Sequence, residues 1–345
     1  MLAQKLSGAT AAAAAQQEYI ALAAVDGVVL AYRWSASGFG TKFTNPATLP
    51  GACYGVTFSP TGSAIAVAHF ATPCIAAYPW SDSGFGTKFA NPATLPTSNG
   101  WGIAFSPTGN AIAVGSGATP FILAYPWSAS GFGTKFANPA TLPTGSGRRV
   151  AFTAAGDAIA IGHTASPFVT AYPWSASGFG TKFANPATLP TPNGWGVAFS
   201  PSDNAIVVTH DSSPYVTAYP WSASGFGTKF ANPATLPNTT ALSVAFSPAG
   251  DAIVMGLAVS PRVAAYSWSA SGFGTKFADP AILPGISGGA YDVAFSSAGD
   301  AVALATTGSP PFINAYPWSA SGFGTKFADP ATASSSGFGI AFGAI

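Results

Sequence analysis

The chain repeats one seven-residue string along almost its whole length, and this internal repeat constrains the fold more than any other feature. Copies of Ser-Gly-Phe-Gly-Thr-Lys-Phe begin at Ser37, Ser83, Ser130, Ser177, Ser224, Ser271 and Ser321. A tryptophan stands three residues before each copy, and successive copies are 46 to 50 residues apart. A period near 47 residues is close to that of β-propeller blades. We therefore expect seven blades, rather than the two ordinary domains that 345 residues would suggest.

One unit, residues 197–237, divides into four short strands with turns between them. Residues 197–200, 205–208, 215–221 and 227–230 are separated by stretches rich in Pro, Asp, Asn and Gly, and no stretch has a helical period. Large and small side chains alternate along the first strand, so each sheet shows a bulky face to one neighbour and a small face to the other. Radial stacking of such sheets buries both faces, which explains why only 7% of the residues are charged.

The two ends of the chain supply different parts of one blade. Residues 19–25 match the second strand of the unit and residues 28–34 the third, so the first blade lacks its innermost strand. Residues 339–342, at the end of the chain, match that missing strand. We expect an all-β, seven-bladed β-propeller with four-stranded blades, closed by pairing of the C-terminal strand with the N-terminal blade. Residues 19–345 would form this single domain, and residues 1–18 an N-terminal arm.

The turn after the first strand resembles a known family. Phe105-Ser-Pro-Thr-Gly-Asn110 and Phe246-Ser-Pro-Ala-Gly-Asp251 are similar to the Phe-Ser-Pro-Asp-Gly turn of WD40-like propellers, and the resemblance covers about 95% of the chain. The Trp-Asp dipeptide of that family is Trp-Ser here, and no Gly-His pair precedes the first strand, so the family's polar tetrad is not implied. The uniform repeats are also loosely similar to phage and bacterial surface propellers. Propellers of this class have many activities, so the resemblance implies a fold and no function.

Charge and hydropathy exclude several classes of partner. The net charge of +1 provides no basic field for nucleic acid. No apolar run approaches the roughly 18 to 20 residues of a membrane-spanning helix. The two cysteines, Cys53 and Cys74, make no disulfide framework. We therefore expect neither a nucleic-acid partner nor a membrane span.

Residues with catalytic chemistry are few and scattered in the sequence. His69, His163 and His210 each precede the tryptophan of their blade by 11 residues and fit the polar ends of strands, and Asp211 is the only further metal ligand nearby. Gly-Phe-Gly-Thr-Lys matches neither a dinucleotide fingerprint nor a P-loop. Glu18 is the only glutamate, and most aspartates occupy turns, so a pair of catalytic carboxylates has little support. These patterns predict no catalytic residue, no metal, no cofactor and no enzyme.

One loop position, four residues before the phenylalanine of each innermost strand, differs from blade to blade and is mostly aromatic. The next position is usually glycine, except at Arg149 and Asp292. Because these strands are innermost, the side chains should surround the mouth of the central channel, where they would form a plug or a platform for a ligand or partner. The candidate binding residues are Tyr54, Trp101, Arg148, Arg149, Trp195, Tyr291, Asp292 and Phe338. Loss of a defined turnover in Arg149→Ala or Asp292→Ala would reverse the prediction that the chain is not an enzyme.

The outer turn, in contrast, is nearly identical in every repeat. It predicts a ring of lysines on the rim: Lys42, Lys88, Lys135, Lys182, Lys229, Lys276 and Lys326. An apolar rim with little charge favours a non-catalytic structural or interaction module that binds a protein partner in a larger assembly, such as a phage virion or a cell-surface structure. The alternative is a multivalent lectin with seven equivalent clefts that bind a glycan. Both hypotheses favour a virion or a cell surface over the cytoplasm.

Overall fold

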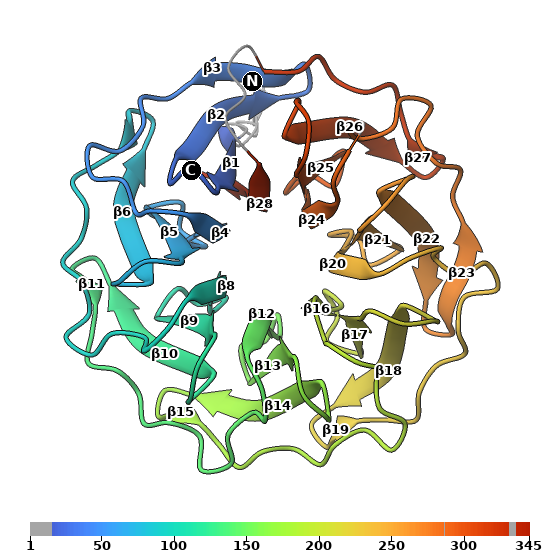
Figure 1. Cartoon of the computed structure of the whole chain (residues 1–345), viewed down its shortest axis with the longest axis horizontal. Coiled ribbons are helices and arrows are strands. Elements are labelled where there is room, and N and C mark those ends of the chain that lie inside the picture. The colour runs from blue at the N-terminus through green and yellow to red at the C-terminus, as the bar shows by residue number, and fades with distance from the viewer. Residues whose placement is uncertain (1–15, 286, 331–335) are drawn as a thin grey trace, which may run out of the picture.

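The computed structural model describes residues 16–285, 287–330 and 336–345. Within these ranges the chain forms 28 strands and no helix, and none of the described segments is a helix that could cross a membrane. The strands build seven antiparallel sheets of four strands each, arranged as blades around a central channel (Figure 1). The prediction of an all-β, seven-bladed propeller is confirmed. Of the expected N-terminal arm, residues 1–15 lie outside the described residues, and Glu18 already belongs to the first strand.

Each blade contributes one strand to each of four concentric layers, and blades 1 to 7 are numbered here from the one that contains the N-terminal strand. The innermost strands of blades 1 to 7 are β28 (Gly337–Ala344), β4 (Cys53–Phe58), β8 (Gly100–Phe105), β12 (Gly147–Phe152), β16 (Val197–Phe199), β20 (Ala241–Phe246) and β24 (Ala290–Phe295). The second strands are β1 (Glu18–Ala24), β5 (Ala64–His69), β9 (Ala111–Ser116), β13 (Ala158–His163), β17 (Ala205–Thr209), β21 (Ala252–Leu257) and β25 (Ala301–Thr306).

The two outer layers follow the same order of blades. The third strands are β2 (Val29–Ser35), β6 (Ile75–Ser81), β10 (Ile122–Ser128), β14 (Val169–Ser175), β18 (Val216–Ser222), β22 (Val263–Ser269) and β26 (Ile313–Ser319). The outermost strands are β3 (Gly38–Lys42), β7 (Gly84–Phe85), β11 (Gly131–Phe132), β15 (Gly178–Phe179), β19 (Gly225–Phe226), β23 (Gly272–Lys276) and β27 (Gly322–Phe323).

The outermost strands differ from the prediction in five of the seven blades. Residues 227–230 were expected as a strand, but β19 ends at Phe226. The physical reason lies in the third strand, where Pro220 has no N–H with which to continue the ladder. In blades 1 and 6 this position holds Arg33 and Ser267, and there the outermost strands β3 and β23 continue to the lysine of the repeat.

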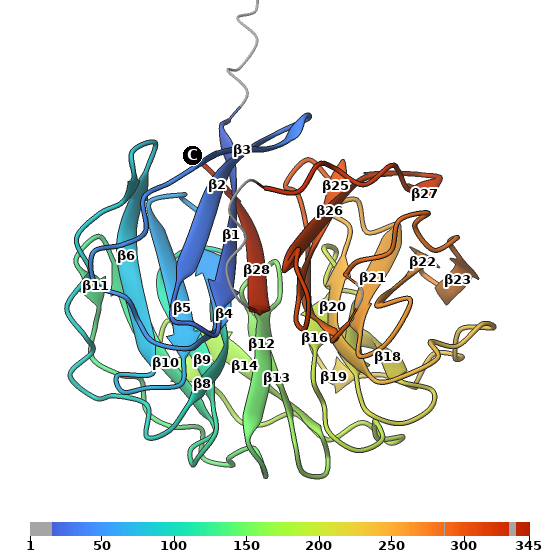
Figure 2. The same cartoon turned by 45° about the horizontal axis from the view of Figure 1, so that its top comes forward.

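The ring is closed by hydrogen bonds between the two ends of the chain. Strand β28 pairs antiparallel with β1, with Ile340 opposite Leu22 and Phe342 opposite Ile20. Figure 2 shows the C-terminal strand seated beside β1 on the channel side of blade 1. The predicted closure is confirmed, and blade 1 is the only blade of the described ring in which the innermost strand is not covalently followed by the second.

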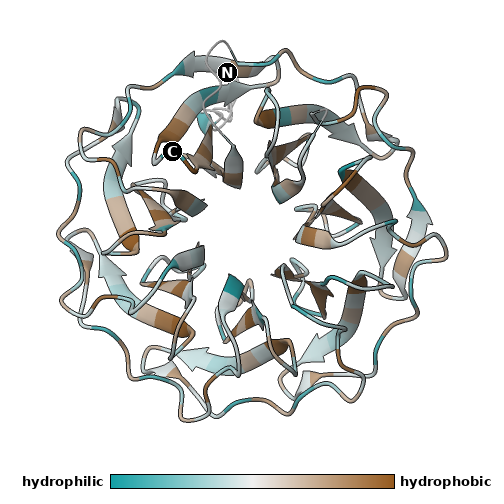
Figure 3. Cartoon of the chain, in the orientation of Figure 1, coloured by the Kyte–Doolittle hydropathy of each residue, from teal (hydrophilic) through white to brown (hydrophobic). Residues whose placement is uncertain are grey.

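The core consists of seven apolar clusters, one between each pair of neighbouring blades. Between blades 5 and 6, for example, the small side chains of Ala205 and Ala218 pack against Ile253 and Met255. Hydrophobic residues accordingly lie on the strands of every blade in Figure 3. Contact between a bulky face and a small face lets the sheets stack closely, as the alternation along the strands predicted.

The repeated tryptophan and the two phenylalanines of the string form one aromatic unit at each interface. The ring of Trp268 lies 5.0 Å from Phe273 of its own blade and 5.6 Å from Phe230 of the preceding blade, with an edge-to-face geometry in both pairs. Such pairs contribute about 0.5–1.5 kcal/mol each beyond their buried area. The string therefore recurs because every blade needs the same contact with its neighbour.

Candidate functional site

The seven variable loop positions meet at one end of the central channel. Tyr54 lies 4.8 Å, ring centre to ring centre, from both Trp101 and Phe338, and Phe338 lies 4.3 Å from Tyr291. Leu242 completes the circle, and the space left between the side chains is about 30 Å³. That volume holds little more than a water molecule or two. In this structure little space is left at the mouth, and the choice between a plug and a platform for a ligand or partner remains a prediction.

Phe70 extends this aromatic circle and was missed in the sequence. Its ring lies 4.8 Å from Tyr54 and 5.5 Å from Trp101, and the residue is 38% exposed. Phe70 follows the second strand of blade 2, and the corresponding positions of blades 3, 4 and 5 hold Gly117, Thr164 and Asp211. A phenylalanine at a position that holds glycine, threonine and aspartate in the next three blades was the available signal.

Arg148 is held between two indole rings at the mouth. Its guanidinium carbon lies 4.0 Å from the ring centre of Trp101 and 4.4 Å from that of Trp195. The Nε and Nη1 atoms are buried and have no acceptor among the described residues. Asp211, the nearby carboxylate, instead accepts hydrogen bonds from Trp195 Nε1 and Asn193 Nδ2. Burial lowers the pKa of Arg148, and its unused donors are available to a ligand or a water molecule.

Arg149 spans the channel and binds the opposite side of the ring. An irregularity of register between Gly147 and Val150 redirects this part of β12. Arg149 Nη2 donates to the carbonyl oxygens of Tyr291 at 3.1 Å and Phe338 at 2.7 Å, and Nη1 donates to that of Tyr54 at 3.3 Å. One side chain of blade 4 thus connects blades 7, 1 and 2.

Asp292 is the anionic partner of Arg149. Its Oδ2 atom lies 3.3 Å from Arg149 Nη2 and accepts a hydrogen bond of 3.0 Å from the backbone N–H of Ile340, on the closing strand β28. Burial raises the pKa of Asp292, and the charge of Arg149 opposes that shift. The carboxylate is therefore a stronger base than an aspartate in water.

A cavity of about 280 Å³ lies along the channel next to this ion pair. Val56, Thr57, Val150 and Val197 are among its lining residues, and most of the surface exposed in it belongs to polar atoms. Arg149 and Asp292 are the only ionisable side chains among the described residues that line it. A base in such a pair can deprotonate a water molecule, and the fixed cation can stabilise the oxyanion that the attack of this water produces.

The three histidines lie apart from this site. His163 and His210 are fully buried and form hydrogen bonds of 2.9 Å through Nε2 to Thr170 and Thr217 of their own blades. In blade 2 the equivalent of these threonines is Ala76, so His69 has no such partner. Burial lowers the pKa of all three to about 4, which keeps them neutral at pH 7. The described residues contain no group of three side chains that could bind a metal ion.

The lysines of the rim each have an acceptor in their own turn. Lys42 Nζ donates to Asn45 at 2.8 Å and Lys135 Nζ to Asn138 at 2.6 Å. The same interaction with the residue three positions later holds Lys88, Lys182, Lys229, Lys276 and Lys326. These contacts give the lysines a structural role, and a binding role remains a prediction.

Comparison with known proteins supports the fold and redirects the function. No family model and no curated protein sequence matches the chain. Among solved structures, a candidate 6-phosphogluconolactonase from Bacteroides fragilis is 10% identical, with a TM-score of 0.76 over 95% of this chain and 98% of that one. The periplasmic gluconolactonase of Pseudomonas aeruginosa is 16% identical, with a TM-score of 0.72 over 95% and 99%. A protein of unknown function from Desulfotomaculum acetoxidans is 15% identical, with a TM-score of 0.70 over 95% and 99%.

These neighbours contradict the function inferred from the sequence. The sequence was interpreted as that of a non-catalytic structural or interaction module, or of a lectin, and not of an enzyme. Three structural neighbours, in contrast, are named as lactonases: those from Bacteroides fragilis, Bacteroides uniformis and Pseudomonas aeruginosa. They support neither a virion component nor a lectin. They also do not single out the WD40-like class among β-propellers. The sequence analysis singled out Arg149 and Asp292 but did not predict that they meet across the channel.

Proposed function

We propose that the protein hydrolyses a lactone, and that the reaction takes place in the channel cavity at Arg149 and Asp292. The observation that carries the proposal is this ion pair, whose members are the only ionisable side chains of the described residues around a cavity of about 280 Å³. The names of the structural neighbours supply the class of substrate. The polar lining suits the hydroxyl groups of a sugar lactone, and the ion pair suits its ester group.

Each charged group has a defined task in this reaction. Asp292 takes a proton from a water molecule as the water oxygen attacks the carbonyl carbon, and the elevated pKa of Asp292 suits it to act as the base. The oxyanion accepts hydrogen bonds from the guanidinium of Arg149, whose Nε–H has no acceptor among the described residues. The ring C–O bond then breaks, and the departing oxygen takes the proton back from Asp292. The product is an open-chain hydroxy acid.

The test measures acid release from δ-gluconolactone at neutral pH, with the uncatalysed rate subtracted. We expect the wild-type protein to accelerate ring opening. In Asp292→Asn this acceleration should fall by a factor of at least about 100, the usual contribution of a positioned base. Asp279→Asn is the matched control, because it removes a carboxylate from the rim at a position where five other repeats already have asparagine. This control should keep its full rate.

Asp292 also accepts a hydrogen bond from the closing strand, so a structural role must be separated from a catalytic one. Circular dichroism and the unfolding temperature identify variants that are folded at the assay temperature. Among those, a pH profile of kcat/KM should fall below the pKa of Asp292 in the wild-type protein. A folded Asp292→Asn protein with an unchanged rate, or a wild-type protein without acceleration on δ-, γ- and phosphorylated sugar lactones, would refute the proposal.

A further inference from the structure

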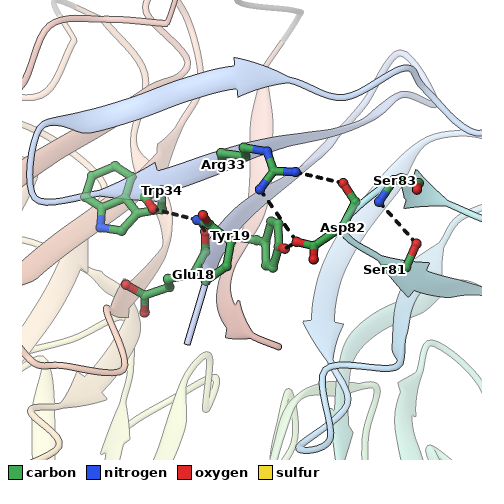
Figure 4. A network of polar contacts seen from close by, with 8 residues as sticks. Glu18, Tyr19, Arg33, Trp34, Ser81, Asp82 and Ser83 are labelled. Carbon is green, nitrogen blue, oxygen red and sulfur yellow. Dashed lines mark hydrogen bonds and ion pairs between the residues drawn. The ribbon is translucent and has the colours of Figure 1, made fainter. Parts of the chain in front are cut away.

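The interface between blades 1 and 2 is filled by a tyrosine side chain. The ring of Tyr19 packs edge-on against Trp80, with ring centres 5.3 Å apart, and lies 5.7 Å from Phe43. Its hydroxyl donates to Asp82, which also forms a 3.6 Å ion pair with Arg33. Figure 4 shows Tyr19 and Arg33 of blade 1 converging on Asp82 of blade 2. Tyr19 is fully buried by these contacts.

The three polar members of this group occur at no other interface. Tyr19 lies opposite Arg33 in the sheet, as Ala205 lies opposite Pro220 in blade 5, so these positions are equivalent. The equivalents of Tyr19 are all alanines: Ala64, Ala111, Ala158, Ala205, Ala252 and Ala301. The equivalents of Asp82 are also alanines: Ala36, Ala129, Ala176, Ala223, Ala270 and Ala320. Six interfaces therefore lack the side chain that fills the seventh.

At two of the interfaces that have alanine in place of Tyr19, the structure contains an open cleft. Between blades 5 and 6 a cleft of about 170 Å³ is lined by Ala205, Pro220, Phe230, Trp268 and Ala270. These are the counterparts, one for one, of Tyr19 and its four neighbours. An equivalent cleft of about 80 Å³ lies between blades 7 and 1, against Trp34. Clefts with equivalent linings thus occur at two separate interfaces, and their lining residues correspond to those around the ring of Tyr19 at a third.

We propose that these inter-blade clefts bind a phenolic ring, and that Tyr19 is the built-in occupant of one of them. The apolar walls formed by tryptophan, phenylalanine and proline suit a flat ring, and tryptophan presents the same edge-to-face surface as in the Tyr19 pair. A free phenol or the tyrosine side chain of a peptide would supply this chemistry. The proposal is independent of the lactonase activity, because it concerns clefts outside the channel.

The polar rim of the cleft explains how the phenol oxygen would be bound. At the filled interface Asp82 accepts a hydrogen bond from the hydroxyl of Tyr19. In the open cleft the rim offers donors instead. Ser269 Oγ accepts the N–H of Ser271 at 3.2 Å, which leaves its own O–H free to donate. Asn204 Oδ1 accepts from Ser200 at 2.8 Å, and its Nδ2 group remains available. The oxygen of the ligand should therefore act as an acceptor in the open cleft.

Binding can be followed at single clefts by ¹⁹F NMR of protein labelled with 5-fluorotryptophan. The Trp→Phe substitutions Trp268→Phe and Trp80→Phe assign the signals of the open and the filled cleft. We expect p-cresol to shift the Trp268 signal saturably and to leave the Trp80 signal unchanged. The nonplanar 4-methylcyclohexanol serves as the ligand control. The peptides Gly-Tyr-Gly and Gly-Leu-Gly test whether a tyrosine side chain is also bound.

Two substitutions exchange the state of the two clefts. Ala205→Tyr should fill the cleft between blades 5 and 6, so that the Trp268 signal no longer responds to p-cresol. Tyr19→Ala should open the cleft between blades 1 and 2, so that the Trp80 signal begins to respond. If Tyr19→Ala weakens ring closure and does not fold, the Ala205→Tyr comparison still decides the question, because blade 5 is covalently continuous.

Saturable shifts of Trp268 with p-cresol or Gly-Tyr-Gly, lost in Ala205→Tyr, would support the proposal, and the ligand that binds would identify the source of the ring. Three results would overturn it. The first is an unresponsive Trp268 signal with both phenolic ligands. The second is an equal response to 4-methylcyclohexanol, which would show that no planar ring is selected. The third is an unchanged response in folded Ala205→Tyr.

Discussion

The central channel and the outer rim are built from the same seven repeats but use them in opposite ways. At the rim, each lysine forms a hydrogen bond within its own turn, and all seven turns are alike. At the channel, neighbouring blades present different side chains, and the bonds of Arg149 reach blades on the far side of the ring. Uniform positions thus make the contacts that every blade needs, whereas variable positions make contacts that exist only once in the ring.

The largest effect on stability is expected at the channel, from Arg149→Met. This change removes three hydrogen bonds to carbonyl groups and leaves Asp292 partly buried beside no cation. Breaking a buried pair in this way costs about 4 kcal/mol of unfolding free energy. Urea unfolding followed by tryptophan fluorescence measures the loss.

The adjacent arginine is the matched control for that prediction. Arg148→Met removes contacts with two indole rings and no hydrogen bond within the described residues, so about 1 kcal/mol should be lost. Equal losses for the two variants would show that the connections across the channel do not hold the ring together.

The second effect concerns the buried histidines, which occupy another position that differs among blades. Their pKa is about 4 in the folded protein and near 6.5 in the unfolded chain, so the unfolded chain binds more protons between these values. The stabilisation is complete above pH 6.5 and is lost as the pH falls toward 4. Each histidine should lower the free energy of unfolding by on the order of 3 kcal/mol as the pH falls through this range.

His69→Ser tests this expectation, because blade 3 has Ser116 at the same position. Unfolding free energies at pH 7.5 and pH 4.5 should differ less in the variant than in the wild-type protein. The difference between the two proteins isolates His69 from carboxylates that titrate in the same range. An identical pH dependence would mean that the pKa of His69 is the same in the folded and the unfolded protein.

The fold was predictable from the sequence because the same pattern of strands and turns occurs seven times. The spacing of the tryptophans, the turns and the split blade at the termini all indicate the same closed ring, and the structure confirms it. The short outermost strands were missed although the signal was present, since Pro220 and its equivalents stand where Arg33 and Ser267 allow a longer strand.

The candidate site was only partly predictable. The loop position identified the residues at the mouth of the channel, because repeated equivalents must lie at the same height. The pairing of Arg149 with Asp292 was not predictable, because it depends on side chains that cross the channel from blades far apart in the ring. Periodicity compares equivalent positions and contains no information about contacts between positions that are unique.

A smaller effect is expected where the blades are alike. The hydroxyl of Tyr219 donates a 2.6 Å hydrogen bond to the carbonyl oxygen of Thr188, and the equivalent tyrosines of five other blades make the same kind of bond to the preceding segment. Tyr219→Phe should therefore lower the unfolding free energy by about 1 kcal/mol. Tyr125→Phe, in a different blade, should do the same, and the double variant should lose the sum. A loss far from additive would reveal coupling between blades through the uniform layer.

The smallest effect is expected at the rim itself, from Lys229→Met. The ammonium group of Lys229 donates a hydrogen bond to Asn232 at the exposed edge of the turn. Because water can replace this exposed partner, the bond should contribute less than about 0.5 kcal/mol to the free energy of unfolding. Lys276 offers the charged counterpart, because its partner is Asp279, which is 40% exposed. The contribution of the Lys276–Asp279 ion pair to the free energy of unfolding should be as small as that of Lys229, and it should decrease further with added salt. A loss above 1 kcal/mol for Lys229→Met in urea unfolding would contradict this expectation. If the loss is small for both lysines, the sevenfold identity of the rim cannot be ascribed to their contribution to stability. The aromatic contacts beneath the rim would then be the structural cause of the repeated string, because Phe230 and Phe273 pack against Trp268 at the same interface.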